Sequence, residues 1–342
     1  MRILVTGAAG FIGSAYVRHV LREHPDDEVL GLDLLTYAGT MANLAEERDN
    51  PRFRFVHGDI ADADLIARLA PDIDAIANFA AETHVDRSLL DPEAFARANV
   101  IGVMTLLDAA RRHGLRMLQV STDEVYGHVP EGEAAREDAR LSPRSPYSAA
   151  KAGGELMCLA YGTSYGTDVV ITRGANTIGP RQYPEKLVPL FVTNALLDLP
   201  LPVYGDGRQV RNWMHVDEHA EAIDLVLRRG RPGQAYNVGA DNERENLDVA
   251  HAILERIGKP RSLIHHVEDR PGHDRRYGLD TALIRDELGW RPRRDWRQTL
   301  HDTVDWYVAN LEWWRAIREH DHRFQEYYER QYGERLAGVG RG

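Results

Sequence analysis

Tyr147 and Lys151 are the residues whose types and spacing first suggest chemistry. They lie four positions apart in a segment with a helical pattern, so both side chains are expected on one face of a helix. A lysine ammonium beside a phenol lowers the pKa of the tyrosine, and a tyrosinate can remove a proton from a sugar hydroxyl. Ser121 and Thr122 end the preceding predicted strand, and the carboxyl end of such a strand is where α/β folds bind ligands. This context indicates a proton-abstraction site at that strand end.

A glycine-rich turn near residue 1 is typical of dinucleotide binding. The strand Ile3–Thr6 is followed by Gly7, Gly10 and Gly13 and then by a helical pattern. The first glycine permits a tight turn, the second lets backbone N–H groups approach a pyrophosphate, and the third lets the helix pack on the strand. The next strand ends at Asp33, whose carboxylate would accept hydrogen bonds from a ribose and repel a 2′-phosphate, which favours NAD over NADP. Other residues expected at the cofactor are Phe11, Ile12, Asp59, Ile60, Ala80 and Ala81.

The elements that must position these groups follow an alternating pattern. Short apolar runs alternate with longer amphipathic segments, as in βαβ units of a parallel sheet. Right-handed crossovers then give an α/β fold with a Rossmann-like, doubly wound parallel sheet. Strands are predicted at Ile3–Val5, Val29–Leu32, Phe53–Val56, Ala75–Phe79, Met117–Val120 and Val169–Thr172, with helices at Phe11–Glu23, Ala61–Leu69, Pro92–Arg112 and Ser148–Tyr165.

The pattern changes after about Thr172, where five prolines fall between residues 180 and 202. Later helices are predicted at Val216–Leu227, Leu247–Ile257 and Trp296–Leu311. We therefore expect an NAD-binding domain at residues 1–172 that carries the Tyr147 helix. A smaller mixed α/β C-terminal substrate lobe is expected at residues 173–320, with some of the chain crossing back, and a polar C-terminal tail at residues 321–342.

Charge and composition exclude several classes of protein. The 342 residues include 53 acidic and 42 basic side chains, a net charge of −11, whereas a nucleic-acid binder needs a basic footprint. Cys158 is the only cysteine, so no intramolecular disulfide or cysteine zinc cluster is possible. No signal peptide precedes the first strand, and no apolar run approaches the ~18 residues of a membrane span. We expect a cytoplasmic protein without nucleic-acid, membrane or metal partners.

Longer runs match a known family. The sequence resembles the extended short-chain dehydrogenase/reductase family in its glycine pattern, Asp33, the Asn78–Ala81 strand end, Thr122 and the Tyr147/Lys151 pair. Within it, the chain is similar to the dTDP-glucose 4,6-dehydratase family of nucleotide-sugar enzymes, over most of its length up to Trp313–Trp314. The runs that carry this similarity are Ala80–Ser88, Ser121–Gly127, Leu201–Gly207 and Asp269–Asp274.

The resemblance implies an NAD-dependent hydro-lyase that converts dTDP-glucose to dTDP-4-keto-6-deoxyglucose. Tyr147 would remove the O4 proton while Thr122 hydrogen-bonds O4, and hydride would pass from C4 to NAD. Glu124 would then remove the C5 proton while protonated Asp123 donates to the departing C6 hydroxyl, and hydride would return to C6. One carboxyl must be ionised and the other protonated, and repulsion between like charges helps to split their pKa values.

The resemblance also implies a nucleotide-sugar pocket in the second half of the chain. Arg211 is expected to clamp the diphosphate, which suits a bidentate guanidinium. The run Arg173–Pro180 departs from the family pattern of two asparagines and a tyrosine before Gly-Pro, because only Asn176 is retained. The nucleotide base, thymidine or uridine, therefore stays open. The other substrate-binding residues implied are Thr83, Asn176, Lys186, Leu187, Pro202, Tyr204, Asn246, Arg270 and His273.

A homodimer is a further implication of the resemblance. The helix with Tyr147 and the segment Pro92–Arg112 would pair with their copies in a four-helix bundle. Val100, Val103, Leu106 and Leu107 offer an apolar face for it.

Other functions on this scaffold remain open at this point. The same dehydration could act on a UDP-sugar. A nucleotide-sugar 4-epimerase or decarboxylase also needs NAD, Thr122, Tyr147 and Lys151, but an epimerase does not need the acid pair, and a decarboxylase usually has a small residue in place of Asp123. A non-catalytic NAD-sensing regulator typically loses the tyrosine or the lysine, and both are present. Asp123 is therefore the discriminating residue.

Overall fold

A seven-stranded sheet forms the larger half of the computed structural model, which describes residues 1–336. The strand order is β10-β6-β5-β4-β1-β2-β3, and every adjacent pair is parallel. The order reverses between β1 and β4, and such a switch point opens a crevice at the carboxyl ends of the strands. The strands are β1 (Arg2–Thr6), β2 (Glu28–Asp33), β3 (Phe53–His57), β4 (Ala75–Asn78), β5 (Arg116–Thr122), β6 (Val169–Gly174) and β10 (Ala235–Val238).

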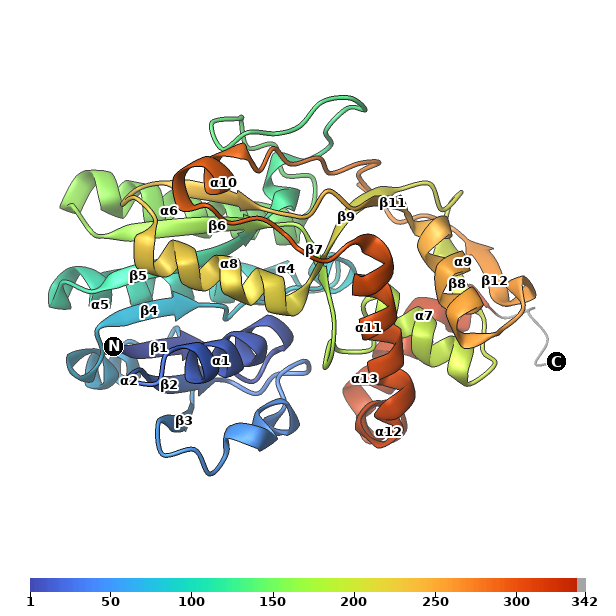
Figure 1. Ribbon diagram of the computed structural model, residues 1–342, viewed down its shortest axis with the longest axis horizontal. Helices are drawn as coiled ribbons and strands as arrows, with labels where there is room; N and C mark the ends of the chain where they lie inside the picture. Colours follow the sequence, from blue (N-terminus) through green and yellow to red (C-terminus); the bar gives the residue numbers. More distant parts are fainter. Residues whose placement is uncertain (337–342) are drawn as a thin grey trace.

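Helices cover both faces of this sheet (Figure 1). One core packs α1 (Phe11–Glu23), α8 (Val216–Arg229) and α10 (Ala282–Leu288) against the sheet, and a second packs α2 (Ala63–Leu69), α5 (Val103–His113) and α6 (Pro146–Tyr165). Successive residues of β1 point to opposite faces, so Ile3 and Val5 join the first core and Leu4 the second. Burial on both faces explains why the strands read as continuous apolar runs.

The smaller lobe holds two short sheets and its own core (Figure 1). One sheet has the order β11-β9-β7 and the other pairs β12 with β8. The strands are β7 (Asn176–Ile178), β8 (Leu201–Tyr204), β9 (Val210–His215), β11 (Glu243–Glu245) and β12 (Ile264–Val267), and the helices are α7 (Leu187–Leu196), α9 (Asn246–Ile257), α11 (Trp296–Ala309), α12 (Leu311–His320) and α13 (His322–Tyr328). Short helices α3 (Val85–Ser88) and α4 (Pro92–Ala96), 3₁₀ turns at Met41–Glu47, Ala70–Asp72, Asp123–Tyr126 and Arg261–Leu263, and π-helical turns at Arg97–Gly102 and Glu329–Gly333 complete the chain.

The predicted doubly wound fold is confirmed, with all six predicted strands in the sheet. The segment predicted as one helix at Pro92–Arg112 is α4, a π-helical turn and α5 in succession. The chain crosses back after residue 173, because α8, β10 and α10 belong to the sheet half. Within the described residues, no helix combines the length and apolarity needed to cross a bilayer.

The last described residues fold onto the rest of the protein. The side chains of Phe324, Tyr327 and Tyr332 are buried, and α13 is followed by a π-helical turn. The segment was expected to be a polar tail, but these aromatic residues give it a buried face as far as Leu336. Residues 337–342 lie outside the described residues.

Three of the four residues expected to form an apolar dimer face lie in the protein's own core, whereas the fourth, Val100, is only partly buried. Val103, Leu106 and Leu107 are fully buried against the sheet of their own chain. The exposed large hydrophobic side chains on these helical segments are Ile101, 45% exposed, Leu156, 55% exposed, and Tyr165 at the end of α6, 59% exposed.

Candidate active site

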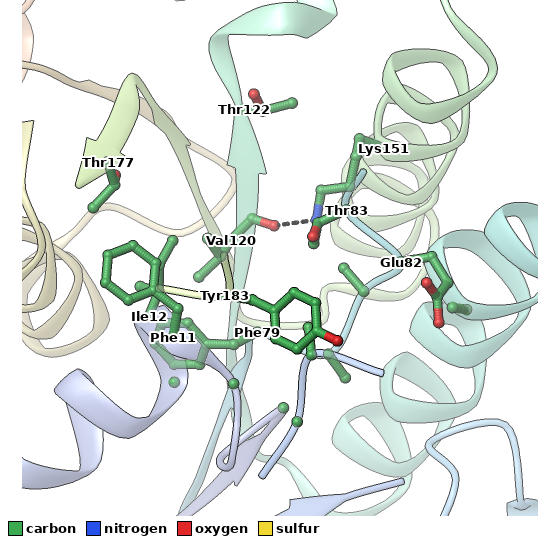
Figure 2. Close-up of a pocket in the computed structure, with 18 of the residues that line it drawn as sticks. Phe11, Ile12, Phe79, Glu82, Thr83, Val120, Thr122, Lys151, Thr177 and Tyr183 are labelled. Atoms are coloured by element: carbon green, nitrogen blue, oxygen red, sulfur yellow. Dashed lines mark hydrogen bonds between the residues drawn. The ribbon is translucent and has the colours of Figure 1, made fainter. Parts of the chain in front are cut away.

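A cleft that is partly open to solvent lies along the carboxyl edge of the sheet. Its walls come from the β1–α1 turn, the ends of β2, β4 and β5, helix α6 and the segment after β6 (Figure 2). The topology therefore brings together groups that are far apart in the sequence. The predicted residues that line it are Gly7, Gly10, Phe11, Ile12, Gly13, Asp33, Asp59, Ile60, Ala80, Ala81, Thr83, Thr122, Asp123, Glu124, Tyr147, Lys151, Asn176 and Lys186.

The backbone of the turn between β1 and α1 requires glycine at two of its positions. Gly7 has φ +65°, and a Cβ there would lie 2.7 Å from the backbone nitrogen of Ala80. A Cβ at Gly13 would collide with the carbonyl oxygen of Gly7. The absence of a side chain at Gly13 therefore lets α1 pack directly on the turn. Gly10 is the N-cap of α1 and has no side chain, so the helix N-terminus faces the cleft with free backbone donors. This arrangement fits the pyrophosphate of a dinucleotide.

Asp33 is fixed at the end of β2 by the backbone. Its Oδ2 accepts from the N–H of Ala9 at 2.9 Å and its Oδ1 from the N–H of Leu35 at 2.7 Å. Burial raises the pKa of Asp33, and these two backbone hydrogen bonds oppose the rise. A carboxylate has about four acceptor sites, so each oxygen keeps room for a ribose hydroxyl. Together with the turn, this donor and acceptor set fits NAD.

Helix α6 carries Tyr147 and Lys151 on its first turns. Ser145 and Ser148 cap it reciprocally and Pro146 occupies its first turn, which fixes the start of the helix. Both functional side chains are buried and line the cleft. The Lys151 Nζ donates to the carbonyl oxygen of Val120 at 2.6 Å, as Figure 2 shows.

The electrostatics of this pair differ from the simple expectation. Burial raises the pKa of Tyr147, Glu124 and Asp123 add to the rise, and a hydrogen bond with Thr122 opposes it. Burial also lowers the pKa of Lys151 to about 8. The predicted lowering of the tyrosine pKa by Lys151 is therefore absent from this arrangement, because desolvation dominates and the ammonium bonds to a carbonyl instead.

The acid pair follows directly on β5. Thr122 caps the 3₁₀ turn by accepting from the N–H of Glu124 at 3.3 Å, and its hydroxyl donates to Asp123 Oδ1 at 3.2 Å. Asp123 is 2% exposed, and among residues 1–336 its Oδ2 has no hydrogen-bond partner. Glu124 is half-buried and accepts from the Tyr277 hydroxyl at 3.4 Å.

Burial and a neighbouring charge make Asp123 a carboxylic acid near neutral pH. Desolvation raises the pKa of Asp123 to about 7, with Glu124 adding to the rise and Arg211 and Thr122 opposing it. The expected repulsion between the carboxyls is present, although burial is the larger cause. The unpartnered oxygen of Asp123 can thus carry a proton toward the cleft.

Two cations beside the acid pair lack anionic partners. Lys186 Nζ donates to the carbonyl of Thr83 at 2.7 Å, and the Arg211 guanidinium donates to the carbonyls of Val210 and Asp274. Neither forms an ion pair with any residue in the described chain. Buried charges are usually paired, so these two side chains mark a place for a ligand anion.

Some predicted substrate residues lie beyond the wall of the cleft. Arg270 pairs with Asp86 at 3.3 Å, Tyr204 donates to the same carboxylate, and His273 contacts Asp269. The Asn246 side-chain oxygen is buried and unpartnered within the described residues. The predicted residues outside the cleft lining are Leu187, Pro202, Tyr204, Arg211, Asn246, Arg270 and His273.

Several lining residues were missed from the sequence. Burial and then Glu185 raise the pKa of Glu82 to about 7. The lining residues in the loop after Asp33 could have been predicted, because this loop follows the carboxyl end of a parallel strand, where ligands bind. No local pattern marks the remaining ones, which come from scattered segments. The missed lining residues include Thr36, Ala38, Gly39, Glu82, Thr177, Tyr183, Glu185 and His219.

Comparisons with known proteins found a matching family model, similar relatives and similar solved structures. Residues 4–303 match the family model of GDP-mannose 4,6 dehydratase. A dTDP-glucose 4,6-dehydratase of Streptomyces antibioticus is 49% identical, with 93% of this chain and 96% of the relative covered. The solved dTDP-glucose 4,6-dehydratase of Streptomyces venezuelae with NAD bound is 50% identical, with a TM-score of 0.91 and coverage of 93% of this chain and 100% of that chain. A UDP-glucuronic acid 4-epimerase of Bacillus cereus in complex with NAD is 28% identical, with a TM-score of 0.85, 90% of this chain and 99% of that chain covered.

Proposed function

The chain belongs to the GDP-mannose 4,6 dehydratase family, with dTDP-glucose 4,6-dehydratases among its relatives, and we propose that it converts dTDP-glucose to dTDP-4-keto-6-deoxyglucose with loss of water. It is an NAD-dependent hydro-lyase of the extended short-chain dehydrogenase/reductase type. We also propose a cytoplasmic location, where NAD and nucleotide sugars are available.

The observation that carries the proposal is the protonatable Asp123 beside Glu124 in the same cleft as Tyr147. A 4-epimerase shares the fold, so the fold alone does not distinguish the two reactions. Only expulsion of a C6 hydroxyl requires a general acid at this place. The pKa of Asp123, raised to about 7, supplies such an acid near neutral pH.

The residues divide the proposed reaction between them. Tyr147 takes the O4 proton while Thr122 holds O4. Burial raises the pKa of this phenol, so it acts as the base only when the positive charge of bound oxidised nicotinamide lowers that pKa. Glu124 removes the C5 proton, which the new 4-ketone acidifies, and Asp123 gives its proton to the C6 hydroxyl, which leaves as water. Glu124 then returns a proton to C5. When bound, NAD accepts hydride from C4 and gives it back to C6, so it is unchanged overall.

Internal return of hydride gives the first prediction. With dTDP-glucose, the enzyme is expected to form a 4-keto-6-deoxy sugar, seen by its alkali-induced absorbance, without net accumulation of NADH. Dinucleotide released by denaturation measures the NAD that copurifies. UDP-glucose in parallel tests the base. NADH accumulating in solution with turnover would rule out the internal transfer, and an epimerised product would reopen the 4-epimerase.

A homodimer is the second part of the proposal. Helix α6 packs closely on the π-helical turn, where a Cβ on Gly153 would touch Val100, and each of these two segments has an exposed apolar side chain, Leu156 and Ile101. We propose that these two side chains, rather than Leu106 and Leu107, contact the partner copy. Exposed apolar residues on adjacent helices suit a self-complementary interface.

The dimer is tested by light scattering. The wild-type protein is expected to have twice the 38.6 kDa mass of the chain. Ile101→Glu combined with Leu156→Glu is expected to give the monomer mass. Val308→Glu is the matched control, because Val308 is 46% exposed on α11 in the other half of the molecule. A monomeric wild type at micromolar concentration would overturn the proposal.

A further inference from the structure

The proposed function leaves the last helix unexplained. α13 lies beyond residue 303, where the family match ends, yet it packs at the junction of the sheet half and the smaller lobe (Figure 1). Its Tyr327 contacts the sheet half, where Arg87 lies 4.5 Å from the ring centroid and the His84 ring is edge-on at 5.1 Å. The neighbouring Tyr328 accepts from Asn194 of the lobe at 3.2 Å. The C-terminal segment, which is α13 and the π-helical turn at Glu329–Gly333, therefore bridges the two halves.

Asp86 is the point where this segment meets the substrate lobe. It is a buried carboxylate on α3, and its Oδ2 accepts from the hydroxyls of Tyr204 at 3.0 Å and Tyr327 at 3.4 Å and from Gln331 Nε2 at 3.3 Å. Its Oδ1 faces the Arg270 guanidinium at 3.3 Å. Three segments that are distant from Asp86 in the sequence thus converge on its side chain.

Tyr204 is held from the same side. Gln331 donates to its hydroxyl, and the buried Tyr332 ring lies 6.4 Å from its ring. His273 contacts the Tyr204 ring edge-on at 6.1 Å. The C-terminal segment thus fixes both the ring and the hydroxyl of a residue that the resemblance implies binds the substrate.

We propose that Asp86, Tyr327 and Gln331 are positioning residues that hold Arg270 and Tyr204 ready for the nucleoside diphosphate end of the substrate. This inference rests on the proposed function, because it takes a nucleotide sugar as the ligand. Two of these residues, Tyr327 and Gln331, lie beyond the matched residues 4–303, and the proposal gives the C-terminal segment a role in substrate affinity rather than in the chemical steps.

The distribution of hydrogen bonds explains how the segment acts. Three donors occupy Asp86 Oδ2, two of them from the C-terminal segment, so only Oδ1 faces Arg270. Removing the two C-terminal donors leaves a buried carboxylate oxygen short of partners. That oxygen would be free to take a second N–H of Arg270 in a bidentate pair, which withdraws the guanidinium from the diphosphate.

A double variant, Tyr327→Phe with Gln331→Met, removes both donors and keeps the side-chain volumes. The control is Tyr328→Phe, which loses a hydroxyl from the same helix but not from Asp86. Calorimetry with dTDP on the NAD-containing enzyme gives the Kd, and steady-state rates with dTDP-glucose give KM and kcat. The double variant is expected to raise Kd and KM roughly 10-fold, because the loss of one charge-assisted hydrogen bond weakens binding by about that factor. The value of kcat is expected to fall much less.

The Tyr328→Phe control is expected to have the wild-type Kd, KM and kcat. Both variants are expected to retain as much NAD as the wild type. A double variant with wild-type Kd for dTDP and only a lower Tm would overturn the positioning role, since the segment would then be a purely structural clamp. If the wild type turns over dTDP-glucose, the proposed function stands, whichever result the double variant gives. A wild type that binds neither dTDP nor UDP would overturn both proposals together.

Discussion

Tyr147→Phe is expected to stop the reaction at its first step. General-base catalysis is typically worth ~10²–10⁴-fold, so turnover should fall by at least that factor. Without the phenol oxygen the group that the proposal assigns to the O4 proton is missing, so a single turnover should show little or no NADH absorbance. The buried ring remains in its edge-on contact with Phe95 at 6.3 Å, so the fold should persist.

Tyr161→Phe is the matched control for this variant. Tyr161 lies on the same helix, and its hydroxyl donates to Asp108 at 3.1 Å, away from the cleft lining. It should keep wild-type turnover. Rapid NADH formation by Tyr147→Phe would show that another group is the base and would remove the tyrosine from the proposed mechanism.

The site residues that could be predicted are those whose position follows from strand order. Asp33 and Thr122 end strands of a parallel sheet, and all such ends meet at one edge. Tyr147 and Lys151 then needed only helical spacing to share a face. Local pattern plus topology was enough for this half of the cleft.

Other features depend on which partner a side chain finds in three dimensions. The Lys151 ammonium bonds to Val120, and nothing in the helical spacing indicates that carbonyl. Arg270 meets Asp86 across 184 residues, and Tyr327 meets it across 241. Hydrophobic periodicity also identified an apolar stripe at Leu106 and Leu107, but periodicity does not say whether such a stripe faces its own sheet or a second copy.

Asp123→Asn is expected to separate oxidation from water loss. Tyr147, Lys151 and Thr122 are untouched, so NAD binding and oxidation at C4 should continue. The amide is a poor general acid, so turnover should fall by ~10²–10⁴-fold while NADH absorbance appears in a single turnover and decays slowly. Glu124→Gln is the comparison, because it should suppress exchange of the C5 proton with solvent deuterium.

The pH dependence gives the same assignment an independent check. Asp123 must be protonated to act, and burial with the neighbouring Glu124 raises its pKa to about 7. The acid is therefore present below pH 7 and is lost as the pH rises through that value, so the water-loss step in the wild type should slow between about pH 6 and pH 8. Asparagine does not titrate, so this fall should vanish in Asp123→Asn while the slow rate remains. Wild-type turnover in the variant, or an unchanged fall with pH, would show that another group protonates the C6 hydroxyl. In that case the cleft would hold only the tyrosine chemistry that a dehydratase shares with a 4-epimerase.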